Sequence, residues 1–257
     1  MELDLTQFGL ERSTKVIWRF PVDDQDPLNH FRSKGLRKFL QKSAELLEKI
    51  GITWKYEALT REAFLNWLPY YQEKMTEQGY DLLATPEWYD SRTGMGRTVE
   101  GMFFYQNGKM VGSGIFTVEG NEKAVFSFKA SDRIDLDNTS NSSLGAVIDY
   151  LFLQKMSEKK IAIISAGQSR NAFGVVNTLG YLDYKLRFGY NPQLPKTPEM
   201  TTTIPVNDDG VVAFFAQPKE GVAGIYLCKP KGKDFHFEVA HYHSPELPFT
   251  TLEYDPV

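Results

Sequence analysis

Apolar residues repeat with helical spacing over one long segment near the start of the chain. From Leu28 to Ile50 they recur every three or four positions and fall on or near one helix face: Leu36, Phe39, Leu40, Leu46, Leu47 and Ile50. Gly51 is typical of the residue that follows a helix end. Just before this segment, the run Lys15 to Val22 has the β-branched and aromatic character of a strand. The pattern therefore predicts a strand followed by one amphipathic helix.

The next stretch predicts a strand and two helices. Ile52 to Leu59 reads as a strand, and Thr60 suits the N-cap of a helix from Arg61 to Gln78. Pro69 lies inside that helix, where proline removes a backbone donor, so we expect a kink or a split there. Thr85 and Pro86 then suit the start of a short helix before a loop from Gly94 to Arg97.

From Val99 the pattern changes from helical spacing to the alternation that is typical of β-strands. Asn107-Gly108 is a strong signal for a two-residue hairpin turn, and Gly120-Asn121 marks a second turn, so three antiparallel strands are predicted up to Ala130. A polar loop and a helix from Ser142 to Lys159 follow. The apolar run Ile161 to Ala166, a helix from Ala172 to Leu179 and a strand from Tyr184 to Tyr190 complete this section. The fold class is α/β of the α+β kind, with a mainly antiparallel sheet flanked by helices.

The last part of the chain, from Thr201, is β-rich and weakly echoes the meander. Phe103-Phe104-Tyr105-Gln106 is matched by Phe214-Phe215-Ala216-Gln217, and Gly114-Ile115-Phe116 by Gly224-Ile225-Tyr226. Two interpretations stay open: a degenerate second half of the fold, or strand chemistry shared by unrelated meanders. The predicted organisation is an N-terminal extension over 1–51, a central domain over 52–195, and a β-rich region over 196–257.

Composition narrows the classes of function. The formal charge is -4 and the pI is near 5.7, which argues against general binding of DNA. The many basic residues between Arg32 and Lys49 form either a solvated helix face or a local RNA contact. Cys228 is the single cysteine, so a disulfide within the chain is excluded and a reducing compartment is the simplest location. His241 and His243 form the one close histidine pair, but no third zinc ligand accompanies them.

The termini and apolar runs carry no targeting signal. Met1 to Ser13 lacks the basic and apolar regions of a signal peptide, and no apolar run reaches the roughly 20 residues that a membrane span needs. We therefore expect a soluble cytoplasmic protein. The oligomeric state has no signal in the sequence.

Two features of the sequence resemble a known superfamily. From Ile52 the order strand, helix, short helix, three-stranded meander, helix, strand, helix and strand is similar to that of GNAT acyltransferases, over a little more than half of the chain. The segment Ser165 to Gly189, SAGQSRNAFGVVNTLGYLDYKLRFG, resembles Fem-type peptidyltransferases and related GNAT-like proteins. Its matching positions are Ser169-Arg170, Gly174, Lys185 and Phe188-Gly189.

The resemblance implies an N-acyltransferase or aminoacyltransferase, with acyl-CoA as co-substrate and a small amine as acceptor. Backbone N–H groups of the strand Ala124 to Ala130, which holds Phe128, would orient the acyl thioester. The start of the following helix, at Asn141, Ser142 and Ser143, would face the donor's pyrophosphate. Arg170 and Lys185 would contact anionic parts of either substrate.

Each of these residues also has a structural interpretation. The three residues from Asn141 to Ser143 suit a plain helix N-cap, Arg170 a surface ion pair, and Lys185 a strand lysine that points to solvent. Glu100, Tyr105 and Tyr184 are the candidates for general acid or base, with a structural role as the alternative. Trp88 either covers the acceptor, together with the nearby glycine loop, or is a buried helix residue.

Two other functions stay open beside acyl-CoA transfer. The usual acyl-CoA signature, a basic or Gln residue before a Gly-rich turn, is replaced here by Thr139-Ser140-Asn141-Ser142-Ser143-Leu144-Gly145-Ala146. That departure favours a GNAT-like module without catalysis, used for ligand binding or interaction. The basic helix from Arg32 to Lys49 favours an aminoacyl-tRNA donor.

Overall fold

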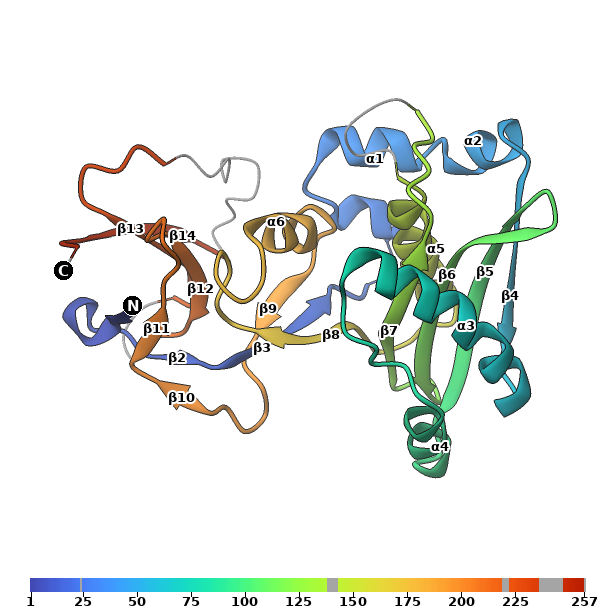
Figure 1. Ribbon diagram of the computed structural model, residues 1–257, viewed down its shortest axis with the longest axis horizontal. Coiled ribbons are helices and arrows are strands. Elements are labelled where there is room, and N and C mark those ends of the chain that lie inside the picture. Colours follow the sequence, from blue (N-terminus) through green and yellow to red (C-terminus); the bar gives the residue numbers. More distant parts are fainter. Residues whose placement is uncertain (24, 138–142, 219–221, 236–246, 257) are drawn as a thin grey trace. The chain divides into compact units, whose positions relative to one another are not determined.

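A computed structural model describes residues 1–23, 25–137, 143–218, 222–235 and 247–256. Contacts divide the chain into two compact units, which Figure 1 shows with their elements labelled. Unit 1 consists of Met1–Phe20 and Gly167–Val257, and unit 2 of Pro21–Ala166. This division by contacts does not follow the segment boundaries predicted from the sequence, because both ends of the chain contribute to unit 1.

Unit 2 is built on the predicted meander. The strands β4 (Ile52–Ala58), β5 (Thr98–Gln106), β6 (Lys109–Glu119) and β7 (Lys123–Ser131) pair antiparallel in that order. The turn between β5 and β6 has positive φ at Asn107 and Gly108, 51° and 77°, as a two-residue hairpin turn requires. The start of β8 (Ile163–Arg170) then pairs parallel with β7. The predicted strands and turn are confirmed.

Helices cover both faces of this sheet. The helices α3 (Arg61–Gln78) and α4 (Pro86–Gly94) pack on one face, where α3 crosses β5 to β7 in Figure 1. The helix α5 (Leu144–Glu158) packs on the other face, against β6 and β7. Gly112 and Gly114 of β6 permit this close approach, since a Cβ at either position would come within 2.9 Å of Leu144 or Ile148. The predicted positions of these three helices are confirmed.

The single-helix prediction for Leu28 to Ile50 is wrong, and of the kink or split expected at Pro69 the split does not occur. The single helix expected from Leu28 to Ile50 is three elements: a 3-10 turn, η2 (Pro27–His30), α1 (Lys34–Leu40) and α2 (Ser43–Lys49). Ser33 explains one break, because its side chain accepts a hydrogen bond from Leu36 N and starts α1 there. The helix α3 is not split at Pro69, and its buried residues, Phe64, Trp67, Leu68, Tyr71 and Met75, lie on both sides of it. Their burial outweighs the roughly 3 kcal/mol cost of an internal proline.

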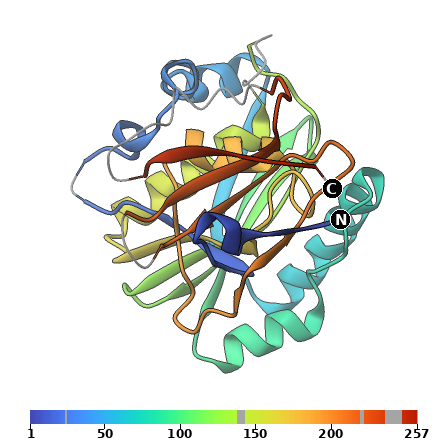
Figure 2. The same ribbon diagram turned by 90° about the vertical axis from the view of Figure 1, so that its left-hand side faces the viewer.

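Unit 1 combines short strands from both ends of the chain. In Figure 2, which faces this part, N- and C-terminal segments lie in one group of strands. The strand β3 (Lys15–Phe20) pairs antiparallel with β9 (Asn191–Gln193), β1 (Glu2–Asp4) with β11 (Thr203–Pro205), and β2 (Arg12–Ser13) with β10 (Met200–Thr201). A further sheet holds β12 (Val212–Ala216), β13 (Gly224–Pro230) and β14 (Phe249–Tyr254). The 3-10 turn η1 spans Leu5–Phe8.

The segment after β8 differs from the prediction. The expected helix over Ala172 to Leu179 and the expected strand over Tyr184 to Tyr190 are both wrong, because the helix α6 occupies Leu179–Arg187 instead. The side chain of Thr178 caps α6 by accepting from Tyr181 N. Within α6, buried positions recur at helical spacing: Leu182, Lys185 and Leu186.

The C-terminal strands pair differently from the meander that they echo. Gly114 faces Met102 across β5 and β6, whereas Gly224 faces Ala216, which matches Tyr105 in the echo. The register is therefore offset by three residues, and β14 joins β13 in parallel. The proposed second half stays a prediction. Among the helices that the structure describes, none has both the length and the apolar character needed to cross a bilayer.

Candidate functional site

The strand β7 has two irregular features side by side. Its pairing with β8 covers three positions and ends at Val125 and Ser165. In its pairing with β6, Phe126 faces Phe116 and Phe128 faces Ile115, so Ser127 is an extra residue, a β-bulge. A bulge leaves its extra residue outside the ladder and re-aims the neighbouring side chains. Bulges of this kind are over-represented next to active sites.

The bulge sends two phenylalanines to opposite faces of the sheet. Phe126 packs against Phe116 and Phe152 of α5, at ring distances of 5.5 and 4.9 Å. Phe128 packs on the α3 and α4 face instead, with its ring 4.6 Å from that of Trp88, edge to face. In a regular strand, Phe126 and Phe128 would be two positions apart and would share one face. The bulge thus turns Phe128 toward Trp88.

Other aromatic rings pack against Phe128 and Trp88. Trp88 stacks on Phe64 at 5.8 Å, and Phe128 lies 5.5 Å from Tyr71 and 6.4 Å from Trp67. The indole nitrogen of Trp67 donates to Ser113 Oγ at 2.9 Å, so its polar atom is satisfied. Beside the bulge, unit 2 therefore holds a packed cluster of aromatic rings that are mostly buried.

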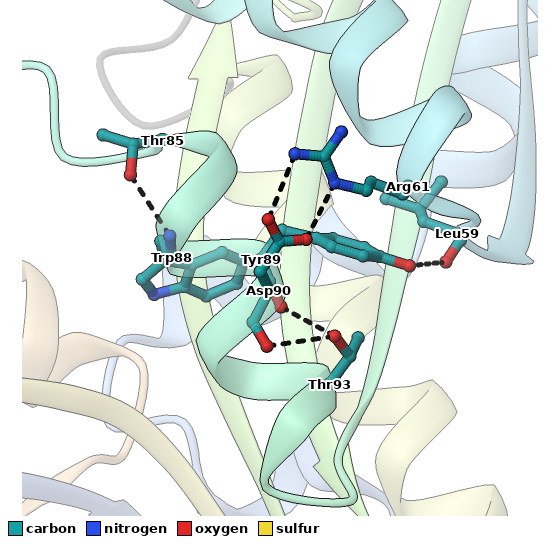
Figure 3. Close-up of polar contacts among 7 residues, drawn as sticks. All are labelled: Leu59, Arg61, Thr85, Trp88, Tyr89, Asp90 and Thr93. Atoms are coloured by element: carbon teal, nitrogen blue, oxygen red, sulfur yellow. Dashed lines mark hydrogen bonds and ion pairs between the residues drawn. The ribbon is translucent and has the colours of Figure 1, made fainter.

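Polar contacts hold α4, and with it Trp88, from two ends (Figure 3). At its start, Thr85 Oγ1 accepts from Trp88 N at 3.2 Å. The hydroxyl of Tyr89, the residue after Trp88, donates to Leu59 O at 2.8 Å, which links α4 to the end of β4.

An arginine on α3 adds a further link to α4. Arg61 pairs with both carboxylate oxygens of Asp90, at 2.8 and 3.1 Å. The hydrogen bond from Arg61 lowers the pKa of Asp90 below its usual range. The guanidinium of Arg92 lies 5.8 Å from the centre of the Trp88 ring. The position of Trp88 is therefore fixed by contacts from α3, α4 and the end of β4.

Glu100 is buried on the α5 face of the sheet, in an ion pair with the partly exposed Lys159. Lys159, at the end of α5, donates to its two oxygens at 2.7 and 2.8 Å, and the Tyr56 hydroxyl donates to the same carboxylate. Burial, and then the hydrogen bond to Glu100, raise the pKa of Tyr56 well above its usual range. The carboxylate thus joins β4, β5 and α5. Its predicted role as an acid or base stays a prediction.

Tyr105 lies on the opposite face from Glu100. It packs against the apolar cluster under α3, with Lys55 Nζ 6.0 Å from its ring centre. Its partner on β6 is Met110, five positions from Ile115, the partner of Phe128. Because β6 has one extra residue between Met110 and Gly112, those five positions span four steps of about 3.4 Å, and Tyr105 is about 14 Å along the sheet from the bulge. Unit 2 does not bring Tyr105 together with Phe128.

The start of α5 is a capped helix end. Ser143 Oγ accepts from Ala146 N at 3.2 Å, and Leu144 N donates to Ile134 O at 3.0 Å. Both amides therefore already have partners, as in the N-cap interpretation of Ser143. Asn141 and Ser142, the other two residues of the expected phosphate contact, lie outside the described residues.

The remaining predicted residues lie in unit 1. Arg170 ends β8 and is exposed. Lys185 is 8% exposed and lies on α6 rather than on a strand, with Nζ 5.2 Å from the Tyr181 ring and 5.1 Å from the Tyr190 ring. The solvent-pointing interpretation of Lys185 is wrong, because α6 turns it toward these rings. Tyr184 packs on Phe188 at 4.7 Å.

Sequence reasoning missed the bulge at Ser127 and the polar partners of Glu100, Lys159 and Tyr56. The alternation of residues does not mark the bulge, and the partners of Glu100 are 44 and 59 residues away in the chain. Within the described residues, no group of three His, Cys, Asp or Glu side chains is arranged to hold a metal. His241 and His243 lie outside the described residues.

Comparisons with known proteins concern the fold. No protein-family model and no curated protein matches the sequence. Among solved structures, FemX is similar with a TM-score of 0.51 and 12% identity, over 74% of this chain and 62% of FemX. L-PGS from Bacillus licheniformis has a TM-score of 0.44 and 14% identity, over 72% of this chain and 60% of its own. A tandem GNAT protein from the clavulanic acid biosynthesis pathway has a TM-score of 0.42 and 13% identity, over 73% and 53%.

The chain thus spans less than two thirds of the length of these solved proteins. At 12% identity the likeness to FemX is a likeness of fold. The resemblance predicted from the sequence is confirmed at that level: the protein has a mixed α/β fold similar to that of FemX.

Proposed function

We propose that this protein is a GNAT-like transferase that moves an acyl group from an activated donor, an acyl-CoA, to an amine. The observation that supports this most is the irregular geometry of β7. Its pairing with β8 ends at Val125, and it has a β-bulge two residues later, at Ser127. A donor carbonyl placed there would meet backbone N–H groups that the ladder does not use.

The chemistry needs little from side chains. The amine nitrogen attacks the thioester carbonyl, the C–N bond forms, and the C–S bond breaks to release the thiolate of CoA. The amine's proton passes to solvent or to the leaving thiolate. The backbone N–H groups at Ser127 and Phe128 would stabilise the oxygen of the tetrahedral intermediate, and the rings of Phe128 and Trp88 would keep water from the thioester.

The predicted contacts to the substrates belong to the same proposal. Ser143, with Asn141 and Ser142, would lie near the donor phosphates, and Arg170 and Lys185 would contact anionic parts of either substrate. Neither Glu100, which is held by Lys159, nor Tyr105 lies beside the bulge, so we propose that the acceptor reaches the site as the free amine.

Thermal unfolding with and without acetyl-CoA, longer acyl-CoAs and free CoA tests donor binding. A donor at 100 times its dissociation constant adds about 2.7 kcal/mol, a rise in Tm of about 5 to 10 °C. We expect Trp88→Leu and Phe128→Leu to abolish the shift. Trp54→Leu, an exposed tryptophan on β4, is the matched control and should keep it. No shift with any donor would contradict acyl-CoA as the donor.

A second donor, aminoacyl-tRNA, is favoured by one specific observation. Lys34, Lys38 and Lys42 recur every four positions along α1 and the residues after it, and Arg37 lies next to Lys38. Within the part of the chain that the structure describes, none of the four has an ion pair. Helical spacing places them on one face, about 12 Å long.

The tRNA donor predicts salt-sensitive RNA binding. Neutralising four phosphates gives a slope of log K against log salt of about -3. Lys34→Glu with Lys38→Glu should weaken tRNA retention on a filter at least tenfold. Lys109→Glu, an exposed lysine on β6, should change it little. Equal effects of the two kinds of variant would contradict a specific RNA surface on α1.

A further inference from the structure

The strand β4 lies at one edge of its sheet, on the side of β5 away from β6 (Figure 1). Among the strands that the structure describes, β5 is its one hydrogen-bonded neighbour. Its seven residues pair with β5 in unbroken register, and none of them is proline. Trp54, Lys55 and Ala58 are exposed. Proteins usually shorten, bulge or cover such an edge, because its free backbone groups readily pair with another strand. β4 is therefore an edge that another strand can extend.

Alternate residues of β4 direct their backbone groups away from β5. Just beyond the strand, Leu59 N donates to Val99 O at 2.8 Å, which fixes the alternation. The odd-numbered residues of β4 bond to β5, and Trp54, Tyr56 and Ala58 turn their N–H and C=O groups outward. Within the part of the chain that the structure describes, these outward groups make no hydrogen bond. Each of the three residues therefore offers one donor and one acceptor to a further strand.

The charges on β4 select one way for two copies of this edge to pair. Lys55 and Glu57 are two positions apart and share one face of the strand, and their side chains are 51% and 39% exposed. In an antiparallel pairing about a two-fold axis at Tyr56, Lys55 of each copy faces Glu57 of the other. An axis one residue away would bring two lysines or two glutamates face to face. Opposite charges directly across two strands are favourable and like charges are unfavourable, so the axis at Tyr56 is preferred.

We propose that β4 is the contact surface for a second copy of this chain, which joins two sheets into one about a two-fold axis at Tyr56. Trp54 of one copy then exchanges backbone hydrogen bonds with Ala58 of the other, so the large indole ring lies opposite a small side chain. A lysine on an edge strand by itself discourages pairing, but here Glu57 of the second copy balances Lys55. A two-fold contact of this kind closes on itself and covers both edges. The inference is independent of the proposed transferase reaction, because its test needs no acyl donor.

Sedimentation velocity over a series of protein concentrations tests the contact. We expect the unaltered protein to shift from monomer to dimer as its concentration rises. Lys55→Glu and Glu57→Lys each place like charges opposite one another, so each should raise the dimer dissociation constant at least about tenfold. The two changes combined exchange the charges and should restore the dimer. Arg133→Glu reverses a charge at an exposed position after β7 and is the matched control, which should dimerise as before.

Three outcomes of that experiment would overturn the proposal. They are a protein that stays monomeric at every concentration, a double variant that dimerises no better than the single variants, and an equal loss in Arg133→Glu.

A proline on β4 tests the backbone pairing itself. Ala58→Pro removes an N–H group that points away from β5, a change that an edge strand tolerates. We therefore expect an unchanged circular dichroism spectrum, together with a dimer dissociation constant raised at least about tenfold by the loss of two hydrogen bonds between the copies. Unchanged dimerisation of Ala58→Pro would mean that the two copies meet elsewhere, and would overturn the pairing through β4.

Discussion

Asn171 joins distant strands in the core of unit 1 through its side-chain amide. It is fully buried, and its Nδ2 donates to Ser13 O at 2.9 Å and to Phe215 O at 2.7 Å, while its Oδ1 accepts from Phe215 N at 2.8 Å. One amide therefore satisfies three backbone groups, from β2 and β12. Arg12, also buried, donates to Asn171 O at 2.9 Å. The side chain joins segments that are 44 and 158 residues away in the chain.

Asn171→Ala leaves those three backbone groups buried without partners. Each costs about 1 to 3 kcal/mol, so the loss is about 3 to 6 kcal/mol, after allowing for partial relaxation and water entry. That is a large part of the 5 to 15 kcal/mol that ordinarily stabilises a domain. Asn171→Asp, with similar shape, turns carboxylate oxygens toward two carbonyl oxygens and should cost at least as much.

Hydrogen exchange measured by mass spectrometry is the assay, because it reports the two units separately. We expect faster exchange in peptides of Met1–Phe20 and Gly167–Val257, with smaller changes in Pro21–Ala166. Asn177→Ala is the matched control: its Nδ2 also donates to a backbone oxygen, that of Arg170, but from an exposed position. We expect it to cost less than 1 kcal/mol. A loss below 1 kcal/mol for Asn171→Ala would refute the reasoning.

Three further predictions concern single side chains. Tyr89→Phe removes the hydrogen bond to Leu59 O, so urea unfolding should show a loss of about 1 kcal/mol, and no loss would contradict the role of that contact. Lys159→Met leaves the carboxylate of Glu100 buried without its cation; because the lysine is about a third exposed, we expect about 2 to 3 kcal/mol, and recovery of part of it when Glu100→Leu is added. Burial raises the pKa of the Cys228 thiol from 9.0 to about 12. The thiol therefore loses its proton at lower pH in the unfolded chain than in the folded protein, so the free energy of unfolding should fall as pH rises from about 9 to 12. A thiol reagent at pH 7 should modify Cys228 at the unfolding rate, and faster modification would contradict its burial.

The sequence predicts those elements that depend on nearby residues. Thr60 caps α3 and the Asn107-Gly108 turn closes the hairpin because both act through their own backbone. The segment from Ala172 to Tyr190 is different. There Asn171 is tied to distant strands, and α6 starts only at the Thr178 cap, so local pattern placed the helix and the strand wrongly.

Some features of the candidate site could also be predicted from the sequence, and others could not. Trp88 and Phe128 could be selected from the sequence as aromatic residues on a helix and a strand, and the structure brings their rings to 4.6 Å. Their contact depends on the extra residue Ser127, which alternation alone does not reveal. The partner of Glu100 is 59 residues away, at the far end of α5, and only the packed structure identifies it.

The most direct test of the transferase proposal is to incubate the protein with an acyl-CoA and a panel of primary amines, and to measure free CoA and acylated amine by mass spectrometry. We predict that the two products form in equal amounts with at least one amine, and that Trp88→Leu and Phe128→Leu lower their rate at least tenfold while Trp54→Leu does not. Binding of acyl-CoA without release of CoA in the presence of any amine would contradict transfer, and would identify a GNAT-like module that binds its ligand without catalysis.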